Sequence, residues 1–381
     1  MRDLEPFDKD GVLDQIAKNQ RKKFDKLFAE KYRAIDEEFA INSYKTNWES
    51  TSEQQYRLFR DVVNAFSPNQ SAHGSNSGFE ATIANPLAEF GDSGADVLLA
   101  MSAPTGVHLC FVSCRVSGER YEEWRQEVAR TEALIQPDDH REELKRQIEC
   151  SDLRIRTVQH LTLTRAEDVF DIDMDVMRTG TPNFYAIWEL IESVVPPEVG
   201  DEGSDEEVER TIRHREGHIE HSDLADIGRE GIDTMGAVNY DLKYCLNTHP
   251  IIPIGEVCLG IYLDNTGKEE PKEFFEGAFE EEYREHVYFG EDRDGLDDII
   301  DTKTGNLLDT ALEYGIVTDN PDDLKEREYR IQWESDEAGD IKKMVKRKFF
   351  KSKAPQEMGE LAFQRAVDEF DSDQLGFGDF D

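Results

Sequence analysis

Apolar residues recur at helical spacing early in the chain and give way to continuous apolar runs further on. One apolar stripe crosses residues 11–40 and a second begins at about Ser52, so two long helices are expected. Residues 67–78 form a polar segment rich in helix breakers. Residues 79–90, followed by Gly91, are expected to form a third helix.

Mainly apolar runs over residues 95–101 and 107–116 have the length of central strands. Amphipathic segments at 121–135 and 138–149 predict two helices, and the alternating segment 153–163 predicts a third strand. Helices and strands in this order, around one central sheet, indicate an α/β fold.

The second half of the chain differs in composition and in its pattern of predicted elements. Residues 196–209 hold seven acidic residues, two prolines and two glycines, which is typical of a linker. A helix at 302–314, a short strand at 328–333 and a basic helix after it are compatible with a winged-helix unit in a mainly helical domain. The expected organisation is a helical arm at 1–50, an α/β domain at 51–195, a linker at 196–210, the helical domain at 211–354 and an acidic tail at 355–381.

The chain is strongly acidic, with 84 Asp and Glu against 44 Lys and Arg and a formal charge of −40. Such a charge destabilises a compact fold through self-repulsion, but at molar salt the Debye length is only about 3 Å. We interpret the composition as adaptation to a salt-rich cytoplasm, as in halophilic organisms. An ordinary acidic protein and a mimic of DNA are the alternatives.

Cysteine spacing and hydropathy exclude several classes of protein. The five cysteines include no CxxC pair, which argues against a zinc ribbon or a redox motif. The first residues lack an apolar signal region, and no run reaches the roughly 18 apolar residues of a membrane helix. A cytoplasmic protein without a membrane partner is therefore expected.

Polar side chains that could do chemistry gather around the first two predicted strands. Asp96 stands at the start of one strand, and alternation puts Ser113 and Arg115 on one face of the next. Glu80, on the helix expected before them, could reach the same point. This spacing resembles the PD-(D/E)XK nuclease superfamily over residues 52–165.

The resemblance implies a restriction-endonuclease-like core, in which helices flank a central mixed sheet. It also implies that Glu80 and Asp96 hold Mg²⁺, and that Ser113 and Arg115 occupy the places of the acidic residue and the lysine. Ser113 offers only a neutral oxygen to a hard cation. Arg115 can stabilise charge on a phosphate, but its pKa is too high for it to act as a base. Catalysis would need another carboxylate, and the nearest in sequence are Glu119, Glu122, Glu123 and Glu127.

Two further clusters are candidates for binding. His214, His218 and His221 could share a metal on a helix, but Gly217 weakens that helix and a solvent-facing helix is the favoured interpretation. Residues 341–353 contain seven basic residues and no acidic one. They could contact phosphates or pair with the protein's own acidic surface. The residues proposed for nucleic-acid contact are Lys342, Lys343, Lys346, Arg347 and Lys348.

Three functions remain open from the sequence. The first is a DNA-acting protein of restriction or defence type, a metal-dependent endonuclease with impaired catalysis. The second is a non-catalytic DNA-binding or partner-binding protein. The third is an acidic decoy that captures a basic protein partner. A homodimer is compatible with each. No GxxxxGK[ST] or GxGxxG loop is present, which argues against nucleotide hydrolysis.

Overall fold

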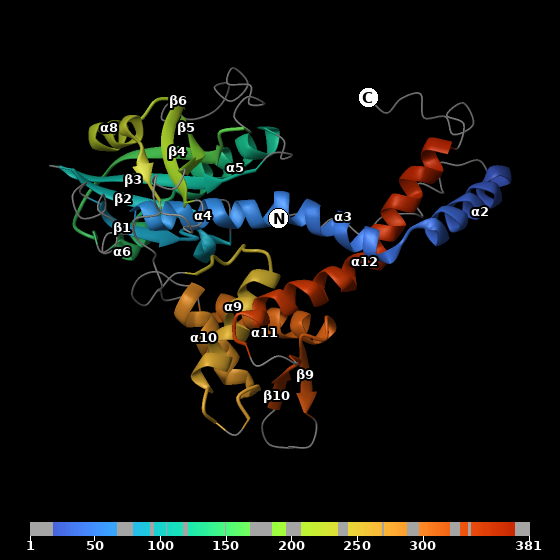
Figure 1. Cartoon of the computed structure of the whole chain (residues 1–381). Coiled ribbons are helices and arrows are strands. Elements are labelled where there is room, and N and C mark those ends of the chain that lie inside the picture. Colours follow the sequence, from blue (N-terminus) through green and yellow to red (C-terminus); the bar gives the residue numbers. More distant parts are fainter. Residues whose placement is uncertain are drawn as a thin grey trace, which may run out of the picture.

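A computed structural model describes most of the chain. The described residues are 18–66, 79–91, 95–103, 105–116, 121–148, 150–167, 185–195, 207–234, 243–268, 270–287, 297–320, 328–333 and 337–369. These residues form a curled sheet flanked by helices, a smaller helical unit with its own sheet, and a long helical arm (Figure 1).

The large sheet has seven strands in the order β1-β2-β3-β4-β5-β6-β7. Strand β3 pairs in parallel with β4, and β4 pairs in parallel with β5, while all the other neighbours are antiparallel. The sheet is therefore mixed, and the expected α/β class is confirmed. The strands are β1 Phe79–Ala84, β2 Val97–Ala103, β3 Gly106–Cys114, β4 Ile155–Arg165, β5 Tyr185–Val195, β6 Glu207–Gly217 and β7 Ile232–Asp233.

Side-chain alternation along the buried strands gives the sheet two apolar faces. On β3, Cys110 and Val112 face helix α4 (Ser52–Phe66) and helix α8 (Ser222–Glu230). The intervening Leu109 and Phe111 belong to a separate core with helix α6 (Asp138–Gln147). Helix α5 (Tyr121–Leu134) covers Tyr185 and Ile187 of β5 through Trp124 and Val128. The predicted strands at 95–101, 107–116 and 153–163 and the helices at 121–135 and 138–149 are confirmed.

Two expectations for the first 90 residues are wrong. The helix expected over 11–40 is divided into α2 (Lys18–Ala34) and α3 (Glu37–Ser50), with Asp36 as the extended N-cap of α3. Residues 1–17 lie outside the described part. Residues 79–84 form edge strand β1 rather than a helix, because they pair with β2 from Phe79 to Ala84. Only a short 3₁₀ turn, Ala88–Phe90, follows before left-handed Gly91.

The sheet also extends beyond the expected domain boundary at residue 195. Strand β6 starts at Glu207, inside the expected linker, and pairs with β5 along almost its whole length. Its charged residues are accommodated by cross-strand ion pairs, including Arg210 with Glu192 at 2.9 Å. His214 therefore lies on a strand, and His218 and His221 follow it, so the three-histidine helix is wrong.

A helical unit follows, with helices α9 (Ile251–Asp264), α10 (Glu276–Val287) and α11 (Asp297–Glu313). Three short strands form a second sheet in the order β8-β10-β9. Their bounds are β8 Glu273–Phe275, β9 Val317–Asn320 and β10 Glu328–Ile331. The helices and the small sheet share one apolar core with Trp48 of α3.

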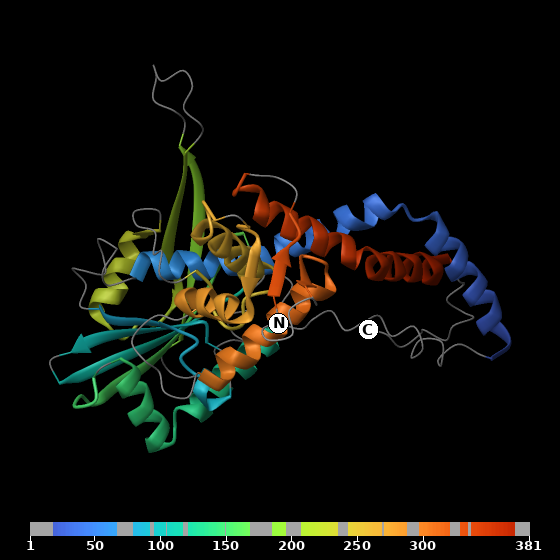
Figure 2. The same cartoon turned by 90° about the horizontal axis from the view of Figure 1, so that it is seen from below.

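Helix α12 (Asp340–Glu369) runs from the helical unit into the arm, where it lies beside α3 and α2 (Figures 1 and 2). It contains Pro355 and continues to Glu369, so the tail expected from residue 355 is helical over its first fifteen residues. Phe24 of α2 packs on Phe363, and Tyr44 of α3 packs on Phe349. None of the helices in the described ranges has the length and apolar character needed to cross a bilayer.

Candidate functional site

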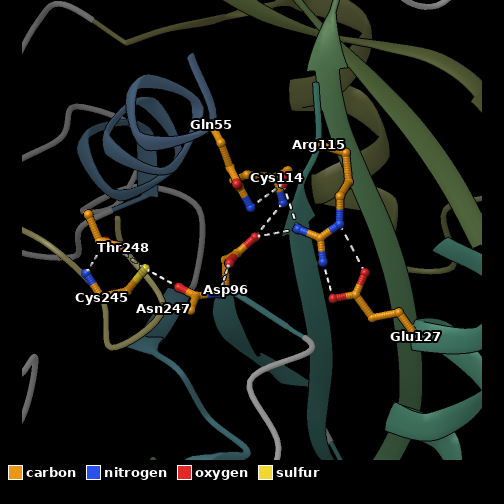
Figure 3. A network of polar contacts seen from close by, with 8 residues as sticks. All are labelled: Gln55, Asp96, Cys114, Arg115, Glu127, Cys245, Asn247 and Thr248. Atoms are coloured by element: carbon orange, nitrogen blue, oxygen red, sulfur yellow. Dashed lines mark hydrogen bonds and ion pairs between the residues drawn. The ribbon is translucent and has the colours of Figure 1, made fainter. Parts of the chain in front are cut away.

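Asp96 and Arg115 meet in a buried ion pair where β2 begins and β3 ends (Figure 3). Arg115 Nη1 lies 2.9 Å from Asp96 Oδ2, and these residues are only 6% and 2% exposed. The Cys114 N–H donates to the same Asp96 oxygen at 2.6 Å. The register that pairs Val97 with Val112 also puts Asp96 across from Ser113, which is half-buried. The predicted placement of residues 96, 113 and 115 at one end of two neighbouring strands therefore agrees with the structure.

Glu127 on α5 completes the charge arrangement around Arg115. Arg115 Nε donates to Glu127 Oε2 at 2.9 Å, and its Nη2 donates to the other carboxylate oxygen. The guanidinium also donates to the Cys114 carbonyl at 2.5 Å, and Gln55 on α4 donates to that carbonyl at 3.3 Å. The guanidinium is therefore fixed by two carboxylates and one backbone oxygen, in the bidentate geometry that arginine favours.

A segment from the second half of the chain contacts the other carboxylate oxygen of Asp96. Asn247 Nδ2 donates to Asp96 Oδ1 at 2.8 Å, and the Cys245 thiol donates to Asn247 Oδ1 at 2.6 Å. Burial raises the pKa of Cys245 to about 12, so the thiol keeps the proton that it donates. Thr248 Oγ1 in turn accepts from the Cys245 N–H at 3.0 Å. These contacts join the sheet to the helical unit across 151 residues of sequence.

This arrangement does not suit Mg²⁺. Asp96 already accepts three hydrogen bonds, which use most of the lone pairs of a carboxylate. Arg115 holds a positive charge where a divalent ion would have to sit. Magnesium prefers carboxylates and water in an octahedral arrangement, and a neighbouring guanidinium opposes it.

The other residues expected at a metal site are placed differently. Glu80 lies on edge strand β1 rather than on a helix, and its side chain is outside the described part, as are those of Glu119, Glu122 and Glu123. Among the described residues, the one cluster with metal-ligand spacing is Glu282, Glu285 and His286. Lys243 Nζ is 2.7 Å from His286 Nε2, so a cation already occupies the approach to this cluster.

The five basic residues expected to contact nucleic acid all lie on the first half of α12, but their surroundings differ. Lys342 pairs with Glu256 at 2.5 Å, and Lys346 pairs with Glu53 at 2.9 Å. Lys348 donates to the Gly315 carbonyl. Lys343 is far more exposed and pairs with Asp340, while Arg347 is exposed and forms no ion pair with any described residue. Part of the cluster thus neutralises the protein's own acids, and part faces outward.

A groove of about 740 Å³ runs along the side of the α3–α12 pair. Its floor is Ile41 and Phe350. One wall carries cations from α12, and the other carries carboxylates at the start of α3. The charged lining residues are Lys343, Lys346, Arg347 and Lys351 on α12, and Asp36, Glu37, Glu38, Lys45 and Glu49 at α3.

Sequence reasoning missed the groove and half of the buried network. The basic segment was visible from composition, but its pairing with α3 depends on contacts between residues some 300 positions apart, such as Ser43 with Glu357. Likewise, nothing near Asp96 in the sequence points to Asn247.

Comparison of the chain with models of protein families, with curated proteins and with solved structures found no match.

Proposed function

We propose that this protein binds nucleic acid through its helical arm and does not cleave it. The observation that carries the proposal is the segregation of positive charge. Helix α2 and residues 341–353 of α12 hold 14 of the 44 Lys and Arg of the chain but only 2 of its 84 Asp and Glu. Clustered cations on one element are the electrostatic footprint of phosphate binding.

The exposed cations of these two basic segments are available to a ligand. Lys22 and Lys26 on α2, and Arg347 and Lys351 on α12, are exposed and form no ion pair within the described ranges. Lys343 is 82% exposed at its side chain. In a protein of charge −40, these exposed cations form a local positive surface to which a phosphate can bind.

Within this proposal the helical unit does not itself contact phosphates. Its elements follow the order α9–β8–α10–α11–β9–β10, and we interpret this unit as a winged-helix domain. The exposed face of α11 is acidic, since Asp297, Asp298, Asp301, Asp309 and Glu313 all lie on it. Such a helix would repel phosphates, and within this proposal the neighbouring α12 makes the contact instead.

The absence of cleavage follows from the chemistry of the buried network. We interpret the mixed sheet as related to a restriction-endonuclease core whose catalytic position has become structural. Asp96 is neutralised by Arg115 and accepts a hydrogen bond from Asn247, rather than being left open to a metal. Without a hard-ion site, the pocket lacks the Lewis acid that phosphodiester hydrolysis of this type requires.

The test is binding of labelled DNA and RNA across a range of KCl concentrations, combined with incubation with Mg²⁺ or Mn²⁺. The variant Lys343→Ser/Arg347→Ser/Lys351→Ser should weaken binding. It should also make the plot of log affinity against log salt shallower, by about 0.7–0.9 for each phosphate that the variant no longer neutralises. A control is Arg229→Ser/Lys268→Ser, which removes two exposed cations outside the arm. This control should leave binding unchanged.

Two results would overturn the proposal. Absence of binding to any nucleic acid, even at low salt, would remove the function altogether. Metal-dependent cleavage that disappears in Asp96→Ala would restore the nuclease.

A further inference from the structure

The groove beside α3 and α12 separates charges that would otherwise pair. Arg347 and Lys351 on one wall, and Glu37 and Glu38 with Asp36 on the other, form no ion pairs within the described ranges. Charges of both signs that are not paired with each other therefore line one groove. A ligand that carries both an anion and hydrogen-bond donors would satisfy both walls.

The cationic wall has a regular spacing. Lys343, Arg347 and Lys351 follow one another at i, i+4 and i+8, so they form a stripe along one face of α12. At 1.5 Å per residue the steps are about 6 Å. This wall therefore offers successive phosphates of an extended strand one cation each.

The carboxylate wall would repel phosphates but can bind base edges. Ionised carboxylates only accept hydrogen bonds, and cytosine N4 is a donor that they recognise. In a single strand the Watson–Crick edges are unpaired and can turn toward such acceptors. The apolar floor of Ile41 and Phe350 lies between the two walls, where the base itself would rest.

The carboxylate wall discriminates between forms of nucleic acid. In a duplex the Watson–Crick edges are engaged in base pairs, whereas in a single strand they are free to donate to the carboxylates. The groove therefore favours a single strand over a duplex.

From these features we infer that the α3–α12 groove is a site for single-stranded nucleic acid, with phosphates on Lys343, Arg347 and Lys351 and base amino groups at the carboxylates of residues 36–38. This inference rests on the proposed function and names the form of nucleic acid that the arm prefers. It also assigns a role to acidic residues that a purely electrostatic site would exclude.

The experiment measures fluorescence anisotropy of short oligo(C), oligo(T) or oligo(U), and a matched duplex, as DNA and as RNA. The single strand should bind at least about tenfold more tightly than the duplex, and oligo(C) more tightly than oligo(T) or oligo(U). Arg347→Ser/Lys351→Ser should remove the preference for the single strand. The control Lys22→Ser/Lys26→Ser, on exposed residues of α2 away from the groove, should weaken all ligands equally.

The decisive variant is Glu37→Ala/Glu38→Ala. If the carboxylates accept hydrogen bonds from base amino groups, this change lowers affinity for oligo(C) relative to oligo(T), by about tenfold. If they only repel phosphates, affinity for every oligonucleotide rises equally, and the inference is overturned. Equal binding of duplex and single strand, unaffected by the groove variants, overturns it while leaving the proposed function intact. A change in oligomeric state without a change in oligonucleotide binding would identify the groove as a protein interface and also overturn it.

Discussion

Replacing Arg115 by Met tests whether the buried network is structural. The substitution removes the cation that neutralises Asp96 while preserving most of the side-chain volume. Asp96, 3% exposed at its side chain, would keep only the Cys114 N–H and Asn247 as donors. The Glu127 side chain is 17% exposed and can turn toward water, so its lost pairing should contribute less to the destabilisation.

Removal of one partner from a buried ion pair typically costs about 3–5 kcal/mol, because it leaves an uncompensated charge. We expect Arg115→Met to lower the free energy of unfolding by that amount. The loss should be nearly the same in dilute and in molar KCl, since buried charges are screened little. The double variant Asp96→Leu/Arg115→Met should cost less than the sum of the single changes, with a coupling of about 1–3 kcal/mol.

Urea-induced unfolding, followed through the four tryptophans, measures these differences. The matched control is Lys45→Met, which removes an exposed i,i+4 pair with Glu49 at 3.6 Å. It should change stability by about 0.5 kcal/mol or less. If Arg115→Met proved as mild as Lys45→Met, the network would not be a structural element and our reasoning about Asp96 would fail.

Two further predictions concern buried carboxylates elsewhere. Burial raises the pKa of Asp61 from 3.8 to about 6, against the opposing effects of Arg210 and Thr234. Between about pH 4 and 6 Asp61 is therefore protonated in the folded protein but ionised in the unfolded chain. The free energy of unfolding consequently falls as the pH rises through this range. Asp61→Asn should remove that slope in urea titrations, and parallel pH curves for the two proteins would contradict it. A Cβ on Gly260 would lie 1.9 Å from Glu282 Oε1, so Gly260→Ala should cost about 1–3 kcal/mol. Gly305→Ala in α11, where a Cβ meets nothing within 4 Å, should instead stabilise by up to about 1 kcal/mol, and equal effects would refute the steric argument.

The central sheet could be predicted because its signals are local. Strands β2 and β3 are mainly apolar runs, and α6 follows Pro137 with two aspartates in its first turn. Because β2 and β3 are joined by a short turn, they pair with each other, and this pairing brings Asp96 close to Arg115. That part of the candidate site depends only on strand alternation and the turn.

Strands β1 and β6 could not be predicted from local patterns. Residues 79–84 become a strand because β2 offers them a partner, which is the usual context dependence of β structure. Strand β6 is rich in Glu and Arg and resembles a solvated helix or linker. It forms a strand because it pairs with β5, and the ion pair between Arg210 and Glu192 stabilises this pairing. Asn247 and the groove likewise depend on contacts between distant parts of the chain.

Helix α12 spans about 45 Å at 1.5 Å per residue, and it touches the helical unit at one end and α2 at the other. It bends along its length in both overall views, and it contains a proline, which removes one backbone hydrogen bond from a helix interior (Figures 1 and 2). A rotation of about 6° at the base of a helix of this length would displace its far end by roughly 5 Å. Small adjustments in the packing of the helical unit would thereby produce much larger displacements at the far end of the arm.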